Sequence, residues 1–210
     1  MIPFEEIKKY LPQYLSVSSQ ENLFEELKNF PDNIDQRFYS GLLTRDKMVY
    51  QGDGLVGMLV VNLPDNKTET VPVMVLSNTC DIDPANKRIF PTRMVYAPIF
   101  DIEKYKQALI GDHVDTGRYS LDSIEAHIDA VKKQFISHIF YLPKGCELKR
   151  ESIVFLDRLN NGPLKSIGEE DVADIKLFTL SDYGFYFFLI KLSIHFTRIR
   201  EGIERPFSVN

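Results

Sequence analysis

Residues 71–77 constrain the fold more than any other segment, because both faces of a strand formed here would be apolar. Val73 and Val75 alternate with Met74 and Leu76, so a period of two leaves no polar face. A strand with two apolar faces is stable only where other elements cover both of them. The sequence therefore predicts that residues 71–77 form a central strand of a β-sheet.

Other short β-rich runs flank this strand along the chain and are separated by turn residues. The predicted strands cover residues 55–63, 94–99, 135–142 and 152–156. Residues 64–67, Pro-Asp-Asn-Lys, and residues 160–163, Asn-Asn-Gly-Pro, have the composition of turns. The pattern indicates a β-domain built from short strands.

An N-terminal helical segment, residues 1–48, is predicted to precede the strands. It reads as a hairpin of two short amphipathic helices that ends near Asp35. The apolar faces consist of Phe4, Ile7 and Leu11 in the first helix, and of Leu23, Phe24, Leu27 and Phe30 in the second. Ser18 lies three residues before Glu21, as a capping box at the start of the second helix requires.

Helical spacing returns within the β-rich region and after it. Residues 101–133 are predicted to be a helical insertion with a cap at Ser120. Residues 181–200 fit both periods, but strands seldom exceed about 10 residues, so their length favours a helix. Lys191, His195, Arg198 and Arg200 are expected to form a solvated stripe on that helix. The predicted fold class is α+β, with residues 49–210 as one β-domain that carries the insertion.

The composition limits the classes of protein to which the chain can belong. Hydrophobic residues make up 44% of it and charged residues 26%, which is typical of a globular domain with its own core. No apolar stretch approaches the ~20 residues of a membrane span, and the first residues lack a signal-peptide pattern, so we expect a soluble, cytoplasmic protein. The net charge of −5 leaves only a local basic groove for any nucleic acid.

The cysteines and histidines give no metal-ligand pattern. Cys80 and Cys146 are the two cysteines, and they form no CxxC pair, so free thiols in a reducing compartment are expected. The histidines, at positions 113, 127, 138 and 195, show neither HxH nor HExxH spacing. No metal and no cofactor is therefore expected.

The order of these segments resembles that of the MazF/PemK family of toxin endoribonucleases. Gly52-Asp53 before an apolar run resembles the Gly-Asp with which that family opens its barrel. Residues 71–78 resemble its proline-containing strand that ends near Ser/Gln-Asn, and residues 95–100 resemble its next apolar strand. The order is completed by residues 139–142, by residues 152–159 and by the last helix.

This resemblance implies an architecture, a ligand and partners. The expected architecture is a small SH3-like β-barrel of MazF/PemK type with an N-terminal helical hairpin, the helical insertion and a C-terminal helix. The implied ligand is RNA or DNA, and the implied partners are an antitoxin or other protein and a second copy in a homodimer. A toxin-antitoxin or phage-defence locus is the implied setting.

The sequence departs from the family at the two positions that carry its catalysis. In the family, an arginine before the strand proline acts with a threonine at the end of the next strand, protonating the leaving group and stabilising charge on phosphate. Val71 and Phe100 stand at these positions, and neither can donate a proton or bear a charge. We therefore expect the RNase site to be lost, or rebuilt from residues such as Lys67, Thr70 or Thr92.

The most polar cluster next to the central strand is Ser-Asn-Thr-Cys-Asp-Ile-Asp at residues 77–83. One interpretation makes Cys80 a nucleophile with Asp81 or a distant histidine as its partner, and another makes Asp81 and Asp83 ligands of a hard cation. A third places Asn78 and Asp81 in an Asx turn while Cys80 packs as a small apolar side chain. As a loop at the end of a central strand, the segment is also a candidate binding edge.

A basic group follows this loop. Its three cations are interleaved with Phe90 and Tyr96, which is the composition of a surface for single-stranded nucleic acid and equally that of a solvated loop. The predicted nucleic-acid-binding residues are Asn78, Lys87, Arg88 and Arg93.

Three functions follow from these observations, and the sequence leaves open whether the chain is an enzyme. The first is a MazF/PemK-like nucleic-acid-binding protein with a lost or rebuilt RNase site. The second is a non-catalytic protein-interaction module, which the acidic net charge and the missing catalytic pair favour. The third is a Cys80-dependent hydrolase, which predicts a thiol that reacts at neutral pH.

Overall fold

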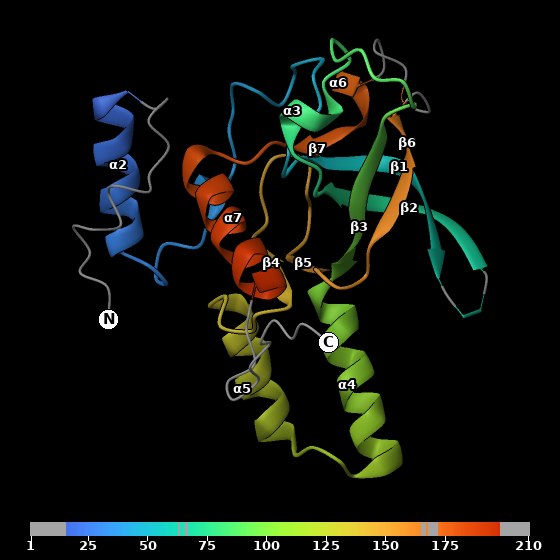
Figure 1. Cartoon of the computed structure of the whole chain (residues 1–210). Coiled ribbons are helices and arrows are strands. Elements are labelled where there is room, and N and C mark those ends of the chain that lie inside the picture. The colour runs from blue at the N-terminus through green and yellow to red at the C-terminus, as the bar shows by residue number, and fades with distance from the viewer. Residues whose placement is uncertain (1–15, 63, 66, 165–166, 168–171, 198–210) are drawn as a thin grey trace, which may run out of the picture.

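The computed structural model describes residues 16–62, 64–65, 67–164, 167 and 172–197. Within these residues the fold is α+β, as predicted, with a seven-stranded antiparallel sheet and helices packed against it (Figure 1). The helices are α2 (Val17–Lys28), the 3₁₀ helix η2 (Gln36–Phe38), α3 (Thr79–Ile82), α4 (Ile102–Thr116), α5 (Leu121–Lys132), α6 (Val172–Ile175) and α7 (Asp182–Thr197). The strands are β1 (Gly54–Asn62), β2 (Lys67–Val75), β3 (Arg93–Asp101), β4 (Ile139–Leu142), β5 (Ser152–Phe155), β6 (Asn160–Pro163) and β7 (Lys176–Phe178).

Strand β2 lies inside the sheet, whose order is β4-β5-β3-β2-β1-β7. Val73 and Val75 face one apolar cluster, whereas Met74 faces a second cluster on the opposite side. All three side chains are fully buried. The prediction of a central strand covered on both faces is therefore confirmed.

Strands β1, β2, β3 and β6 curl around the first of these clusters. Strand β6 pairs with the first half of β3, and β5 pairs with its last residues. The Val61 backbone N–H donates to the Asn160 side-chain Oδ1 at 2.9 Å, and the Tyr96 hydroxyl donates to the Leu59 carbonyl at 2.6 Å. The far end of β1 is thus joined to β6 and β3 by hydrogen bonds across the curl.

Residues 160–163 are strand β6, so the prediction of a turn there is wrong. Gly162 pairs with Met94, and a Cβ on this glycine would lie 3.1 Å from the Tyr96 hydroxyl oxygen. A glycine in a strand can mark a close approach of this kind as well as a turn. Turn composition alone does not separate the two cases.

The helical insertion is confirmed as the antiparallel pair α4 and α5. Ser120 caps α5, because its Oγ accepts from the Ser123 backbone N–H at 3.1 Å. The pair projects from one end of the sheet, whereas α3 and α6 lie at the opposite end (Figure 1). Together with β4 and β5, the two helices enclose a cluster of their own.

Strand β4 begins at Ile139, four residues later than predicted, because the chain turns sharply after α5. Gln134 has a φ of 62°, and its buried side chain then pairs with both backbone groups of one residue in β4. Its Nε2 donates to the Tyr141 carbonyl at 2.6 Å, and its Oε1 accepts from the Tyr141 N–H at 3.1 Å. The amide therefore satisfies part of the outer edge of β4.

The second predicted N-terminal helix is α2, and the first lies outside the described residues. Leu23 and Phe24 are buried against α7, as their spacing predicts. The cap is Ser16 rather than Ser18, because the Ser16 hydroxyl already accepts from the Ser19 backbone N–H at 3.2 Å. Ser18 lies inside the helix.

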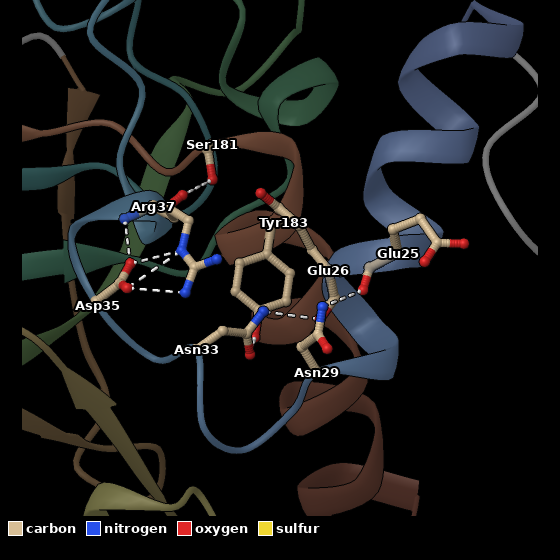
Figure 2. A network of polar contacts seen from close by, with 8 residues as sticks. All are labelled: Glu25, Glu26, Asn29, Asn33, Asp35, Arg37, Ser181 and Tyr183. Atoms are coloured by element: carbon tan, nitrogen blue, oxygen red, sulfur yellow. Dashed lines mark hydrogen bonds and ion pairs between the residues drawn. The ribbon is translucent and has the colours of Figure 1, made fainter.

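A polar network joins the end of α2 to α7 (Figure 2). Asn33 is 2% exposed, and its Nδ2 donates to the Glu26 carbonyl of α2 at 2.7 Å. The Tyr183 hydroxyl of α7 donates to the Asn33 Oδ1 at 2.7 Å. Beside them, Arg37 is paired with Asp35 at 2.8 Å, in the turn that leads into η2. Asn33 is thus the link between the two helices.

Replacing Tyr183 with phenylalanine tests this link. The change deprives the buried Asn33 Oδ1 of its donor, so the free energy of unfolding should fall by about 1–3 kcal/mol. Tyr119→Phe is the matched control, because Tyr119 is 54% exposed. Urea unfolding curves of both variants measure the difference, and equal stability would contradict the assigned role.

Lys191 of α7 is buried, so the predicted solvated stripe is wrong at this position. The side chain is 4% exposed, and its Nζ donates to the Gln134 carbonyl at 2.5 Å, just after α5 ends. Carbonyl groups at a helix C-terminus favour a cation. Burial nevertheless lowers the pKa of Lys191 to about 8.

This lowered pKa predicts a pH dependence of stability. Between about pH 8 and about pH 10 the unfolded chain holds the Lys191 proton more fully than the folded chain, so the free energy of unfolding should gain a contribution that rises with pH. Lys191→Met should lack this contribution. Urea unfolding of both proteins at about pH 7.5 and about pH 9.5 measures it, and parallel pH profiles would contradict it.

Candidate nucleic-acid interface

A pocket of about 1080 Å³ lies at the end of the molecule that carries α3 and α6. Three separate segments of the chain form it: the connector before β1, the loop between α3 and β3, and the residues after β6. We name it the 82–92 pocket, after the loop that supplies most of its wall. The described residues that line it are Lys47, Met48, Val49, Ile82, Asp83, Pro84, Asn86, Arg88, Ile89, Phe90, Pro91, Thr92, Leu164, Ile167 and Val172.

The floor of the pocket is apolar. Ile82 and Val172 are 2% and 4% exposed, and Val49 and Leu164 are partly buried in the cluster inside the curled strands. The floor is therefore an extension of that core. Such a surface favours the flat or apolar part of a ligand.

The rim of the pocket exposes large apolar side chains. Ile89 is 97% exposed and Phe90 is 82% exposed, and Met48 of the connector is also exposed in the pocket lining. Leaving a side chain of this size in water forgoes about 1.5–3 kcal/mol relative to burial. Contiguous apolar exposure beside a pocket marks an interaction site.

Cations lie in two of the segments that form this pocket, which Asp83 also lines. Residues 84–93 contain Lys87, Arg88 and Arg93 but no carboxylate, and Lys47 lies on the connector side. The Arg88 guanidinium is paired with Asp81 at 2.7 Å. In the described part of the chain, no carboxylate lies within 4.0 Å of Lys47 or Lys87. The loop after α3 therefore carries a local group of cations on a chain that is acidic overall.

The loop at residues 77–83 is organised by side-chain caps. Asn78 is the N-cap of α3, and its Oδ1 accepts from the Cys80 backbone N–H at 2.9 Å, as the Asx-turn interpretation expects. Asp83 accepts from the Ala85 N–H at 2.8 Å. Asp81 does not behave as that interpretation expects, because its carboxylate pairs with the Arg88 side chain. The role that the structure gives Asn78 is thus to shape the loop.

Cys80 is exposed rather than packed as a small apolar side chain. Within the described residues, no side chain forms a hydrogen bond with its thiol, so neither Asp81 nor a histidine is placed to activate it. The geometry therefore provides no general base for a Cys80-dependent hydrolase.

The remaining predicted residues are spread over different places. Thr92 is half-buried at the edge of the pocket, and Lys67 and Thr70 are exposed on the β1–β2 hairpin. Arg93 donates to the Asn161 side chain at 2.6 Å and so braces β6 against β3. Tyr96 is 3% exposed inside the curled strands, so the idea that it is interleaved with the basic residues on the surface is wrong.

The two positions of the family's catalytic pair lie in different clusters. Val71 packs on the cluster inside the curled strands, whereas Phe100 packs on the cluster of α4 and α5, with its ring 5.5 Å from that of Phe155. Neither position lines the 82–92 pocket. The structure thus brings no acid and base together at these positions.

The connector that carries Lys47 and Met48 is fixed by a buried ion pair. Asp53 and Lys176 are 3.2 Å apart, and both side chains are 0% exposed. Lys176 also donates to the Leu43 carbonyl at 3.3 Å, and Asp53 accepts from the Tyr50 N–H at 2.8 Å. Burial raises the pKa of Asp53, and the neighbouring ammonium opposes this increase.

A second set of bonds ties the connector to the loop across from it. The Gln51 backbone N–H donates to the Thr79 hydroxyl at 2.9 Å, and the Gln51 side chain donates to the Leu76 carbonyl at 2.8 Å. The connector is therefore tied to the start of α3, the helix that precedes the loop of the pocket, before any ligand binds. Such preorganisation reduces the entropy lost on binding.

Other kinds of site find no support in the described residues. No group of three or more His, Cys, Asp or Glu side chains there is arranged to hold a metal ion. Nor is any helix among them long and apolar enough to cross a membrane.

Comparison with known proteins does not assign the chain to a family. No protein-family model matches it, and no curated protein is significantly similar to it. The relation to the MazF/PemK family therefore stays a prediction from segment order.

Of the four predicted nucleic-acid-binding residues, Arg88 lines the pocket, whereas Asn78, Lys87 and Arg93 do not. Asp83, Phe90 and Thr92, which the sequence also singled out, line it too, but most of the lining was missed. Lys47, Met48 and the residues after β6 are far from the loop in the sequence, and no local pattern connects them. Ile89 was detectable, because an apolar Ile-Phe pair between turn residues and Pro91 fits neither strand nor helix.

Breaking the buried ion pair tests how far the site depends on it. Asp53→Asn leaves a buried ammonium without a counter-charge and should lower the free energy of unfolding by about 3–5 kcal/mol. Combining it with Lys176→Met should cost less than the sum of the single changes, because the paired charges disappear together. Glu147→Gln, which breaks an exposed pair, is the control and should cost about 0–1 kcal/mol. Strict additivity in urea unfolding would contradict the coupling.

Proposed function

We propose that this protein is a MazF/PemK-like barrel protein that binds single-stranded RNA at the 82–92 pocket and does not cut it. The observation that carries the proposal is the combination, at one pocket, of an apolar floor, an exposed Phe90 and cations from two segments of the chain. The apolar floor and the Phe90 ring can contact a base, and the cations can contact a phosphate.

Phe90 offers a face on which a base can stack. Proteins that bind single strands place bases on aromatic rings, and each such contact contributes about 1–3 kcal/mol whatever the base. The pocket volume of about 1080 Å³ is slightly above the usual range of about 300–1,000 Å³ for ligand sites, so a base next to the ring can enter it.

Lys47, Lys87 and Arg88 offer contacts to phosphate. Lys47 and Arg88 line the pocket from two different segments of the chain, and Lys87 precedes Arg88 in the loop, so a strand that crosses the pocket can meet cations of both segments. Contacts of this kind position the strand without reading its sequence. Because the protein is acidic overall, binding depends on this local group and should be sensitive to salt.

Two observations support the barrel class and the absence of cleavage. Four strands curl until the Val61 N–H of β1 reaches the Asn160 side chain of β6, and this curl fits a small SH3-like barrel. Val71 and Phe100 supply no proton donor and lie in separate clusters. A toxin-antitoxin setting and a homodimer stay predictions from the resemblance.

A protein partner is the second candidate ligand, and one observation favours it. Ile89 is the most exposed large apolar side chain of the pocket, and an aliphatic side chain stacks poorly on a base. An acidic peptide with a bulky apolar residue would use the same floor and the same cations. The two candidates differ in whether free RNA binds at all.

An RNA-binding assay on Phe90→Ala tests the proposal. The loss of the stacking face should weaken retention of a mixed single-stranded RNA pool by about 5- to 150-fold. Phe196→Ala is the matched control, because Phe196 is 56% exposed on α7, and it should bind as the wild type does. Lys87→Gln should weaken binding uniformly and make its salt dependence less steep.

The same samples test the absence of cleavage and the alternative ligand. The RNA should remain full length with and without divalent metal, and single-stranded DNA measured in parallel shows whether the sugar matters. If the wild type retains no RNA at about 50 mM salt, the proposal is wrong. Binding of acidic synthetic peptides that is lost in Ile89→Ser would then favour the protein-binding function.

A further inference from the structure

Arg88 is the one pocket-lining cation that is already paired within the described residues. Its Nη2 donates to Asp81 Oδ1 at 2.7 Å, with side chains that are 46% and 67% exposed. Asp81 belongs to α3, whose start is fixed by Asn78, whereas Arg88 belongs to the loop beyond it. The pair therefore connects a rigid turn to the loop that carries Phe90.

Asp83, the carboxylate that lines the pocket, has different surroundings from Asp81. Asp83 accepts from the Ala85 backbone N–H, and no cation lies within 4.0 Å of it among the described residues. Two aspartates two residues apart thus have distinct surroundings. One faces the guanidinium that the proposed function assigns to phosphate, and the other caps a turn.

A carboxylate and a phosphate compete for the same guanidinium donors. Arginine binds either group through a planar fork, and two parallel bonds to a phosphate are stronger than one bond to a carboxylate oxygen. The single contact of Asp81 is exposed, and such pairs contribute little to stability. A phosphate of an incoming strand can therefore replace Asp81 without disturbing the fold.

We propose that Asp81 is a built-in competitor of the bound strand: it occupies Arg88 in the free protein and is displaced by a phosphate on binding. This inference rests on the proposed function. Asp81 therefore lowers the affinity for the strand, because the displaced carboxylate stays near the phosphate and repels it. A ligand with a single phosphate near a base gains less from Arg88 than a continuous strand does.

The experiment compares two changes that remove the same charge. Asp81→Asn should tighten binding of a fluorescent single-stranded RNA pool by about two- to fivefold and steepen its salt dependence by about one phosphate contact. Asp83→Asn removes an equal charge from the same pocket but should change affinity less than twofold. Asp81→Ala is a second variant, and both position-81 variants should keep the far-ultraviolet circular dichroism of the wild type.

Variants of the partner complete the test. In an Arg88→Gln background, Asp81→Asn should no longer tighten binding, because no guanidinium remains to be released. Equal tightening by Asp81→Asn and Asp83→Asn, or tightening that persists without Arg88, would overturn the inference while leaving RNA binding intact. If neither the wild type nor any variant binds RNA, the proposed function itself is wrong and the inference with it.

Discussion

The buried ion pair between Asp53 and Lys176 holds together parts of the chain that are far apart in sequence. Both side chains are completely buried, and they join the start of β1 to β7, the edge strand beside it. The ammonium also lies over the Tyr50 ring at 4.9 Å and donates to the Leu43 carbonyl. Charges removed from water in this way are stable only as a pair. The connector, the sheet edge and one wall of the 82–92 pocket are therefore held by this ion pair, together with the Gln51 bonds to Thr79 and Leu76.

The fold was predictable where a local pattern carried the information. Alternation in residues 71–77 identified a central strand, and helical spacing identified α5 and α7. The sequence-based predictions failed where a contact between residues distant in the sequence determines the local structure. Asn160 and Gly162 have turn composition but form a strand, because β3 and β1 approach them closely. Lys191 has the character of a surface residue but lies beneath the end of α5, which no pattern within its own helix reveals.

The candidate site shows the same division. Lys87, Arg88 and Phe90 lie close together in the sequence, so the local composition alone indicated them. The rest of the lining comes from the connector and from residues after β6, and these meet only because the strands curl. Tyr96 was grouped with the basic residues on sequence proximity, yet strand alternation turns it inward. The charged residues of the loop could therefore be predicted from the sequence, whereas the pocket itself could not, because it forms only in the folded chain.

Gln134 has a consequence for how copies of this protein behave toward one another. Strand β4 is an outer strand of the sheet within the described residues, and an open strand edge is a template for pairing with another chain. The Gln134 amide occupies both backbone groups of Tyr141, as a neighbouring strand would. The Gln134 side chain thus occupies backbone groups of the exposed edge of β4. Resistance to edge-to-edge aggregation at β4 therefore depends on a residue that belongs to no strand.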